Sequence, residues 1–348
     1  MLTRLPMLVA IAVFFVVLFT IVAGVDSASL PKANAAAPSG LLVVENQFDH
    51  ALLLVDPVAR REIARVVVGV NGHEVTLSKD GRLAYVPIYS NVAIGEPGTD
   101  GNTIDIVDLQ ARKLVGSMDL GKPVRPHRAQ LGPDGLLYVT AELDNAVAVI
   151  DPATQNVLAK IPTDQPQTHM LVLTPDGQRA YTANVSAGSV SVLDLKTRKL
   201  ITVIPISKTI QRISISPDGR RVFTHDRESA RVAVIDTASN KISDWIAMPE
   251  MAYASTPTPD GRWLLVATNG SDRHRLYAVD LQTLKIVHSW DLPGIPLELL
   301  VRPGGDEAYV SCIQAGKIAV LNLHSWEMEE PINLSRGVDG LAWTTAVR

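Results

Sequence analysis

The 348-residue sequence predicts an all-β protein, a seven-bladed β-propeller of four-stranded antiparallel blades. Three observations favour this fold. A Pro-Asp-Gly-like turn recurs between two short apolar runs. An apolar run that ends in an acid or its amide recurs at nearly the same spacing, and the two ends of the repeat region complement each other. Self-similarity at a fixed period indicates a repeat architecture.

The two landmarks keep one period. The turn glycine advances by 54, 42, 42, 42 and 44 residues, through Gly81, Gly135, Gly177, Gly219, Gly261 and Gly305. The acid or amide advances by 52, 43, 43, 42, 44 and 42 residues, through Asp56, Asp108, Asp151, Asp194, Asp236, Asp280 and Asn322. A period in the forties is typical of a propeller blade.

Residues 169–206 show how one unit divides into strands. HMLVLT runs into the Pro175-Asp176-Gly177 turn, and RAYTAN returns. SVSVLD then leads to a second turn, and KLITVIPI follows it. Runs of five to eight residues rich in Val, Ile, Thr and Tyr predict strands, and Pro with Gly at the turn favours a hairpin.

The turns count six units and the acids count seven, which indicates how the ring closes. The repeat region begins at Leu41 without a first strand, and GVDGLAWTTAVR at its end supplies a first strand without the rest of a blade. We therefore expect residues 338–347 to complete the blade that begins at Leu41. Closure leaves no open sheet edge and produces seven blades.

The repeat resembles the YVTN β-propeller repeat family. The shared pattern is [ST]-P-D-G-x-x-x-Y-V-x-N followed by V-x-V-[IL]-D-x-x-T-x-K, over residues 40–347. Lys79 replaces the turn proline in the second blade, Pro87 interrupts its return strand, and Gly304 replaces the aspartate in the seventh. The resemblance implies a secreted protein, similar to surface-layer, lactonase-type and amine-dehydrogenase-subunit propellers. It is specific for fold and weak for function.

The first 40 residues predict export. An apolar run follows Arg4 and extends to about Val25, and Ala33-Asn34-Ala35 fits a signal-peptidase site. We assign residues 1–35 to a signal peptide, 36–40 to a linker and 41–348 to one propeller domain. The alternative is an uncleaved membrane anchor, since the run approaches the ~20 residues that span a bilayer. Both predict a periplasmic, secreted or outward-facing protein.

Composition excludes several functions. A net charge of −4 argues against nucleic-acid binding, and a single cysteine, Cys312, excludes an intrachain disulfide. The sequence has no nucleophile-elbow, zinc-protease, P-loop or dinucleotide-binding motif in a suitable setting. We expect a monomer whose partner is a small molecule or a protein at the mouth of the central channel.

Candidate site residues lie eight positions before each turn glycine, near the start of the strand that lines the channel. Around the ring this position is occupied by Asp339, His73, His127, His169, Gln211, Tyr253 and Leu297. Three histidines beside an acid suit Zn, Cu, Fe or Ni, with His73, His127 and His169 as ligands and Asp339 as a base. The alternative is that the histidines are inherited with the repeat and bond to neighbouring blades. Glu298 is one residue late, so it joins the site only if its repeat slips by one.

Arginines supply a second candidate feature. Several lie at first-strand starts or in loops between second and third strands: Arg125, Arg128, Arg212, Arg227, Arg273 and Arg275. Their guanidinium groups suit a ligand carboxylate or phosphate. We take Arg128, Gln211, Arg212 and Tyr253 as ligand-binding candidates, and the insertion at residues 90–103 as a lid or substrate loop. The alternatives are that the arginines form a solvated rim and that the insertion is a spacer.

Two functions remain open. The sequence favours an extracytoplasmic scaffold that binds a ligand or partner at its channel mouth. The alternative is a metal-dependent lyase or lactone hydrolase that uses the three histidines.

Overall fold

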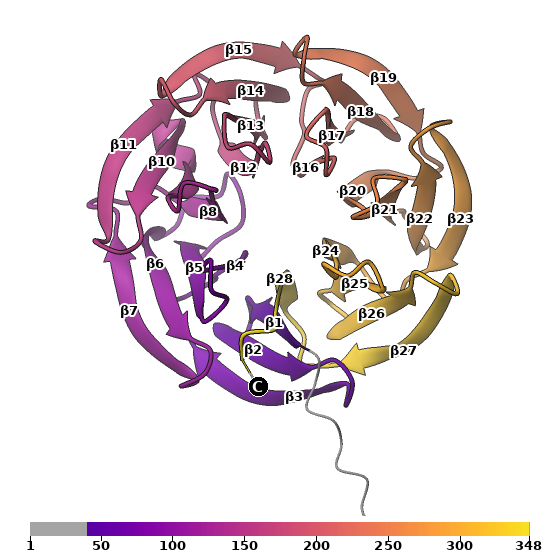
Figure 1. Cartoon of the computed structure of the whole chain (residues 1–348), viewed down its shortest axis with the longest axis horizontal. Coiled ribbons are helices and arrows are strands. Elements are labelled where there is room, and N and C mark those ends of the chain that lie inside the picture. Colours follow the sequence, from indigo (N-terminus) through magenta and orange to yellow (C-terminus); the bar gives the residue numbers. More distant parts are fainter. Residues whose placement is uncertain (1–39, 348) are drawn as a thin grey trace, which may run out of the picture. The chain divides into compact units, whose positions relative to one another are not determined.

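The computed structural model describes residues 40–347, which form a ring of seven four-stranded antiparallel sheets (Figure 1). The predicted fold is confirmed. The predicted signal peptide and nearly all of the predicted linker lie outside the described residues. Among residues 40–347 no helix has the length and apolarity to cross a membrane.

The sheets follow the predicted repeat. Blade one contains β28 (Val338–Thr344), β1 (Leu41–Asn46), β2 (Ala51–Asp56) and β3 (Arg61–Val67). Blade two contains β4 (Thr76–Leu77), β5 (Leu83–Ser90), β6 (Asp100–Asp108) and β7 (Lys113–Asp119). Blade three contains β8 (Pro126–Leu131), β9 (Leu137–Ala141), β10 (Ala146–Asp151) and β11 (Asn156–Pro162), with the short 3-10 helix η1 (Glu142–Asp144) after β9.

The remaining blades repeat the same order. Blade four contains β12 (Thr168–Leu173), β13 (Arg179–Asn184), β14 (Ser189–Asp194) and β15 (Lys199–Pro205). Blade five contains β16 (Ile213–Ile215), β17 (Arg221–Asp226), β18 (Arg231–Asp236) and β19 (Lys241–Ala247). Blade six contains β20 (Ala252–Pro257), β21 (Trp263–Asn269), β22 (His274–Asp280) and β23 (Lys285–Asp291). Blade seven contains β24 (Pro296–Val301), β25 (Glu307–Cys312), β26 (Lys317–Asn322) and β27 (Glu327–Asn333).

Ring closure is as the sequence predicts. β1 pairs with β2 on one side and with β28 on the other, where Leu41 faces Thr344 and Val43 faces Ala342. The C-terminal strand therefore completes the first blade. No blade in the described ring is left without its inner strand.

The core lies between neighbouring blades. β2 and β14 are buried along almost their whole length, because each sheet packs against a blade on both faces. The outermost strands, such as β11, alternate between exposed and covered residues. Cys312 belongs to the core between blades six and seven, which agrees with a structural thiol.

The inner strands share a β-bulge near their starts. In β8 the partners Pro126–Ala141 and Ala129–Val139 leave one extra residue on the inner strand. The same irregularity occurs in β12, β20, β24 and β28. A bulge turns two successive side chains away from the regular alternation. In these five of the seven inner strands it lets two adjacent residues turn toward the centre, whereas the pairings of β4 and β16 contain no bulge.

Candidate ligand site at the channel mouth

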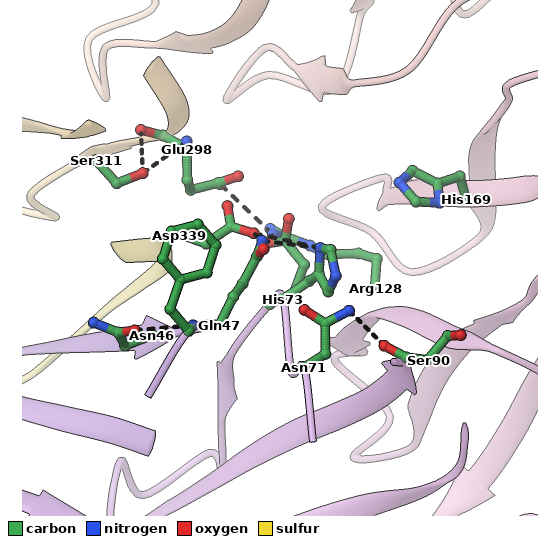
Figure 2. Close-up of polar contacts among 12 residues, drawn as sticks. Asn46, Gln47, Asn71, His73, Ser90, Arg128, His169, Glu298, Ser311 and Asp339 are labelled. Atoms are coloured by element: carbon green, nitrogen blue, oxygen red, sulfur yellow. Dashed lines mark hydrogen bonds and ion pairs between the residues drawn. The ribbon is translucent and has the colours of Figure 1, made fainter. Parts of the chain in front are cut away.

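The centre of the ring is filled by an ionic cluster drawn from five blades. Nη1 of Arg212, in blade five, lies 3.0 Å from Oε1 of Glu74 and also contacts Glu298, while its Nη2 lies 3.3 Å from Oδ1 of Asp339. Arg128 donates to Glu74 at 2.5 Å and lies 3.6 Å from Glu298. Figure 2 shows Asp339, Glu298 and Arg128, three members of this cluster. The cluster links blades one, two, three, five and seven.

Glu298 is therefore part of the site. The bulge between Pro296 and Leu299 supplies the one-residue slip that its participation requires. Its carboxylate contacts Arg212 and approaches Arg128. In blade seven the ring position is occupied by the apolar Leu297, and the next residue, Glu298, supplies the polar side chain in its place.

The guanidinium groups of Arg128 and Arg212 are already paired with the chain's own carboxylates. A ligand carboxylate or phosphate at these two residues would have to compete with Glu74, Glu298 and Asp339. The cluster sets three acids against two bases. Burial is the largest cause that raises the pKa values of Glu298 and Asp339, and repulsion by Glu74 adds to it. With all five groups ionised the carboxylates outnumber the guanidinium groups, and the raised pKa values of Glu298 and Asp339 act to reduce that negative excess.

The three predicted histidines come together beside this cluster. The ring centroids of His73 and His127 lie 4.9 Å apart, and those of His127 and His169 lie 3.6 Å apart. Tyr89, at the end of β5, packs edge-on against all three rings at 5.2–5.9 Å. The predicted juxtaposition of blades two, three and four is therefore present.

Burial keeps two of these histidines neutral. It is the largest cause that lowers the pKa of His73 from 6.5 to about 3, helped by the nearby His169 and Arg212. Burial also holds the pKa of His127 well below its ordinary value. Neutral imidazole carries one donor and one acceptor, so the partner of one nitrogen determines the role of the other.

His169 and His73 have opposite hydrogen-bonding roles. Glu142 lies 3.0 Å from His169 Nδ1 and accepts a bond from the Tyr89 hydroxyl at 3.0 Å, so His169 donates to Glu142 through Nδ1. The Gln47 amide nitrogen donates to Asp339 and lies 3.1 Å from His73 Nδ1. His73 Nδ1 therefore accepts, and its Nε2 carries the hydrogen.

Two ring nitrogens in this group have no partner. His73 Nε2 and His127 Nδ1 are buried and form no hydrogen bond among the described residues. His73 keeps 16% of its side chain exposed and Arg128 keeps 23%, whereas His127 and His169 are buried. Buried polar atoms without partners are costly and are rare in native proteins, so these two nitrogens are candidate positions for hydrogen bonds to a bound molecule.

A shared metal ion fits this arrangement poorly. Imidazoles that bind one ion aim a nitrogen lone pair at it, whereas His127 and His169 lie with their rings stacked at 37°. His73 presents an N–H, which is not a ligand. Within residues 40–347 no group of three or more His, Cys, Asp or Glu is placed to hold a metal ion.

The other predicted ligand residues lie across the channel. Gln211 donates to the Tyr253 hydroxyl at 3.2 Å. The guanidinium groups of Arg212 and Arg227 lie 5.6 and 4.9 Å from the centroid of the Tyr253 ring. Gln211 and Tyr253 are both partly exposed. They belong to the part of the channel mouth that blades five and six contribute.

The insertion at residues 90–103 borders a cavity beside the histidines. Gly95, Glu96 and Pro97 line one wall of a cavity of about 410 Å³, and Arg125 and Glu142 line another. Arg125 fastens the loop by donating to the Glu96 carbonyl at 2.6 Å and by pairing with Asp100. Glu142 thus joins this cavity to Tyr89 and His169.

Sequence reasoning missed four residues of the site. Glu74 lies seven positions before its turn glycine, the register that Arg128, Arg212 and Glu298 share, so a second ring position was present in the sequence. Glu142 ends the second-strand region of blade three, where blade four has Asn184. Tyr89 and Gln47 follow no repeated pattern and become visible only when the blades are packed.

The comparisons place the chain by fold alone. No family model matches the sequence, and no curated protein matches it. Similar solved structures include Kuenenia stuttgartiensis hydrazine synthase, with a TM-score of 0.66, 18% identity, and coverage of 77% of this chain and 88% of that chain. The dihydro-heme d1 dehydrogenase NirN in complex with DHE has a TM-score of 0.65 and 17% identity, over 92% of this chain and 78% of that one. A functionally unknown protein from Desulfotomaculum acetoxidans has a TM-score of 0.72 and 12% identity, over 87% and 98%.

Proposed function

We propose that the chain is an extracytoplasmic binding propeller of the YVTN type, which holds a small polar ligand at its channel mouth. The observation that carries this proposal is the pair of buried, unpartnered nitrogens, His73 Nε2 and His127 Nδ1. An oxygen atom of the ligand accepts a hydrogen bond from His73 Nε2–H. A hydroxyl or amide group of the same ligand forms a hydrogen bond with His127 Nδ1. Burial makes both bonds count for more than they would in water.

The charge of the mouth narrows the ligand class. Arg128 and Arg212 are occupied by internal carboxylates, and the acids outnumber them. A neutral molecule with carbonyl and hydroxyl groups avoids that competition, whereas an anion does not. The cavity that Glu142 lines is of the size that small ligands occupy, although none of the three histidines lines it.

The test is a thermal-shift screen of the chain from residue 36 onward with three sets of small probes: neutral hydroxy-carbonyl compounds, carboxylates and amines. We expect stabilisation by the neutral set, its loss in His127→Ala, and its retention in His324→Ala, a control at an exposed histidine. Stabilisation equals RT ln(1 + [L]/Kd), so about 100 Kd of probe adds roughly 2.7 kcal/mol. Failure of all three sets, or hits that His127→Ala retains, would sink the proposal.

Metal-dependent lyase or hydrolase activity is the second candidate, and the tautomer of His169 favours it. The Glu142 carboxylate that accepts its Nδ1–H is the arrangement found behind metal-bound histidines. His169 would hold the ion, and His73 and His127 would join only if the rings rearranged. The metal would polarise a carbonyl or activate water, with Asp339 as base.

Melting with and without Zn, Cu, Ni or Fe separates the two candidates. If the three histidines share an ion, wild type shifts with metal, and His73→Ala, His127→Ala and His169→Ala each abolish the shift. If they do not, no metal-dependent shift appears. The three substitutions then cost on the order of 1 kcal/mol each, and their costs tend to add.

The similarity to solved structures supports the proposed function only at the level of the fold. The solved neighbours include two enzymes, one of them in complex with a bound molecule. Identities of 17 and 18% carry neither activity to this chain.

A further inference from the structure

A groove lined by aromatic rings lies between blades six and seven, at the end of the inner strands opposite the channel mouth. It encloses about 630 Å³ and is lined by Trp263, His288 and Trp326, with Asp260 and His324 among its polar residues. It is bordered by the Asp260 turn that follows β20 and by the turn between β26 and β27. None of its residues belongs to the site described above.

Three of the aromatic rings are stacked, and a fourth stands nearly perpendicular to them. Trp326 lies parallel to Trp290, with an interplanar angle of 8° and centroids 5.7 Å apart, and His288 stacks on Trp326 at 5.0 Å and 19°. Trp263 stands against Trp326 at 81° and 5.4 Å. Trp290 Nε1 donates to the Trp326 carbonyl at 3.0 Å, which fixes the two indoles relative to each other.

These aromatics depart from the repeat. Trp263 occupies the position of Arg179 and Arg221 in the two preceding blades, and Trp290 replaces the buried Ile204 and Ile246. The corresponding groove between blades four and five is lined without any aromatic residue. Two of the five tryptophans in the sequence therefore line one groove, and a third, Trp290, packs against Trp326 beside it. The packing of a blade does not require them, since the other blades form without them.

Trp326 occupies a conformation that rarely suits a bulky side chain. Its φ is +59°, in the left-handed region, as at the equivalent turn positions of the other six blades. Those positions carry Arg60, Arg112, Gln155, Arg198, Asn240 and Leu284. The turn demands the conformation but not the indole. The positive φ is therefore a property of this turn in every blade, and only the indole is particular to blade seven.

We propose that this groove binds a carbohydrate, namely a β-linked oligosaccharide of gluco configuration. A pyranose whose hydroxyls are all equatorial presents a face of C–H groups, and the negative face of an indole attracts that face. The hydroxyls at the ring edge need hydrogen-bond partners. Asp260 uses Oδ1 for its own turn, accepting from Thr258 and from the Arg262 amide, and its Oδ2 has no partner among the described residues. His324, paired with Asp306 at 3.0 Å, supplies a second polar group.

Tryptophan fluorescence and calorimetry with cellohexaose and chitohexaose test this proposal. We expect both probes to bind wild type and to change its tryptophan emission. Trp326→Ala and Trp263→Ala should each weaken binding about tenfold or more, because aromatic anchors dominate such contacts. Trp245→Ala is the matched control, since Trp245 lies in blade five beneath Arg231, and it should leave affinity unchanged.

A second probe tests the stacking geometry. A β-1,4-galactan hexasaccharide, whose axial oxygen at C4 carries the glycosidic linkage and bends the chain away from a flat ring face, should bind about tenfold more weakly than cellohexaose. No binding of either gluco-configured probe, or affinity that is unchanged in both Trp326→Ala and Trp263→Ala, overturns the proposal. Binding of tetramethylammonium in place of the sugars, with the same loss in Trp326→Ala, would identify a cation site and also overturn it. The result does not depend on the channel-mouth ligand, because His127→Ala leaves this groove intact.

Discussion

Arg212 and Glu74 lie 138 residues apart in the sequence and 3.0 Å apart in the fold, where they join blade five to blade two across the ring. Arg212 also pairs with Glu298 and Asp339. One side chain thus neutralises acids from blades one, two and seven. Because Arg212 pairs with acids from three other blades, its charge contributes to the stability of the whole ring and not of one blade.

Replacing Arg212 with Met should lower the free energy of unfolding by about 3–5 kcal/mol, because it leaves buried carboxylates without a counter-charge. Urea denaturation measures the loss. Arg227→Met is the control: Arg227 packs on Tyr253 and forms no ion pair among residues 40–347, so we expect a cost of roughly 0.5–1 kcal/mol. Equal losses in the two variants would show that the central cluster contributes no more than surface packing.

His225 should make the protein sensitive to acid. It is buried, both of its ring nitrogens lack partners among the described residues, and burial with the nearby Arg212 and Arg227 lowers its pKa from 6.5 to about 3. The unfolded chain therefore binds more protons between these values, and stability falls as the pH drops through that window. His225→Leu should reduce this slope by up to about 1.4 kcal/mol per pH unit. Identical pH profiles for the variant and wild type would contradict the assignment.

Glu45 should act in the opposite direction. Its carboxyl oxygens are buried without partners in the described structure, and burial raises its pKa well above 4.5, with Asp339 and Glu74 adding repulsion. A raised pKa contributes stability below pH 4.5 that is lost as the pH rises through the folded value. Glu45→Gln should therefore gain stability relative to wild type as the pH increases. Chemical denaturation at a series of pH values measures the difference, and a constant difference would refute the prediction.

Deleting residues from Val338 onward should cost far more than the loss of an exposed tail. The deletion removes β28 and exposes the edge of β1, whose six residues are all buried. We expect a fall in melting temperature of many degrees, or failure to fold, monitored by circular dichroism. A truncated protein that melts close to full length would mean that β28 contributes little to the ring.

The repeat made most of the fold predictable. A period read from the turn glycines and the strand-ending acids fixes the blades, and Leu41 without a preceding strand fixes the closure. The histidines were located because copies of one register must approach the channel together. The bulge that brings in Glu298 was not predictable, since it arises from pairing between strands. Glu142 and Tyr89 are recruited across blade boundaries, and no spacing in the sequence encodes that contact.

The pairing of β1 with β28 has a consequence for the nascent chain. β1 is among the first strands to be synthesised, while its partner is among the last. Until residue 344 is available, the edge of Leu41–Asn46 that faces away from β2 has no native partner, and the side chains of this strand lack the cover of β28. An unpaired strand edge of this kind is vulnerable to aggregation during synthesis. The exposure of this edge therefore lasts for as long as the rest of the ring takes to be made.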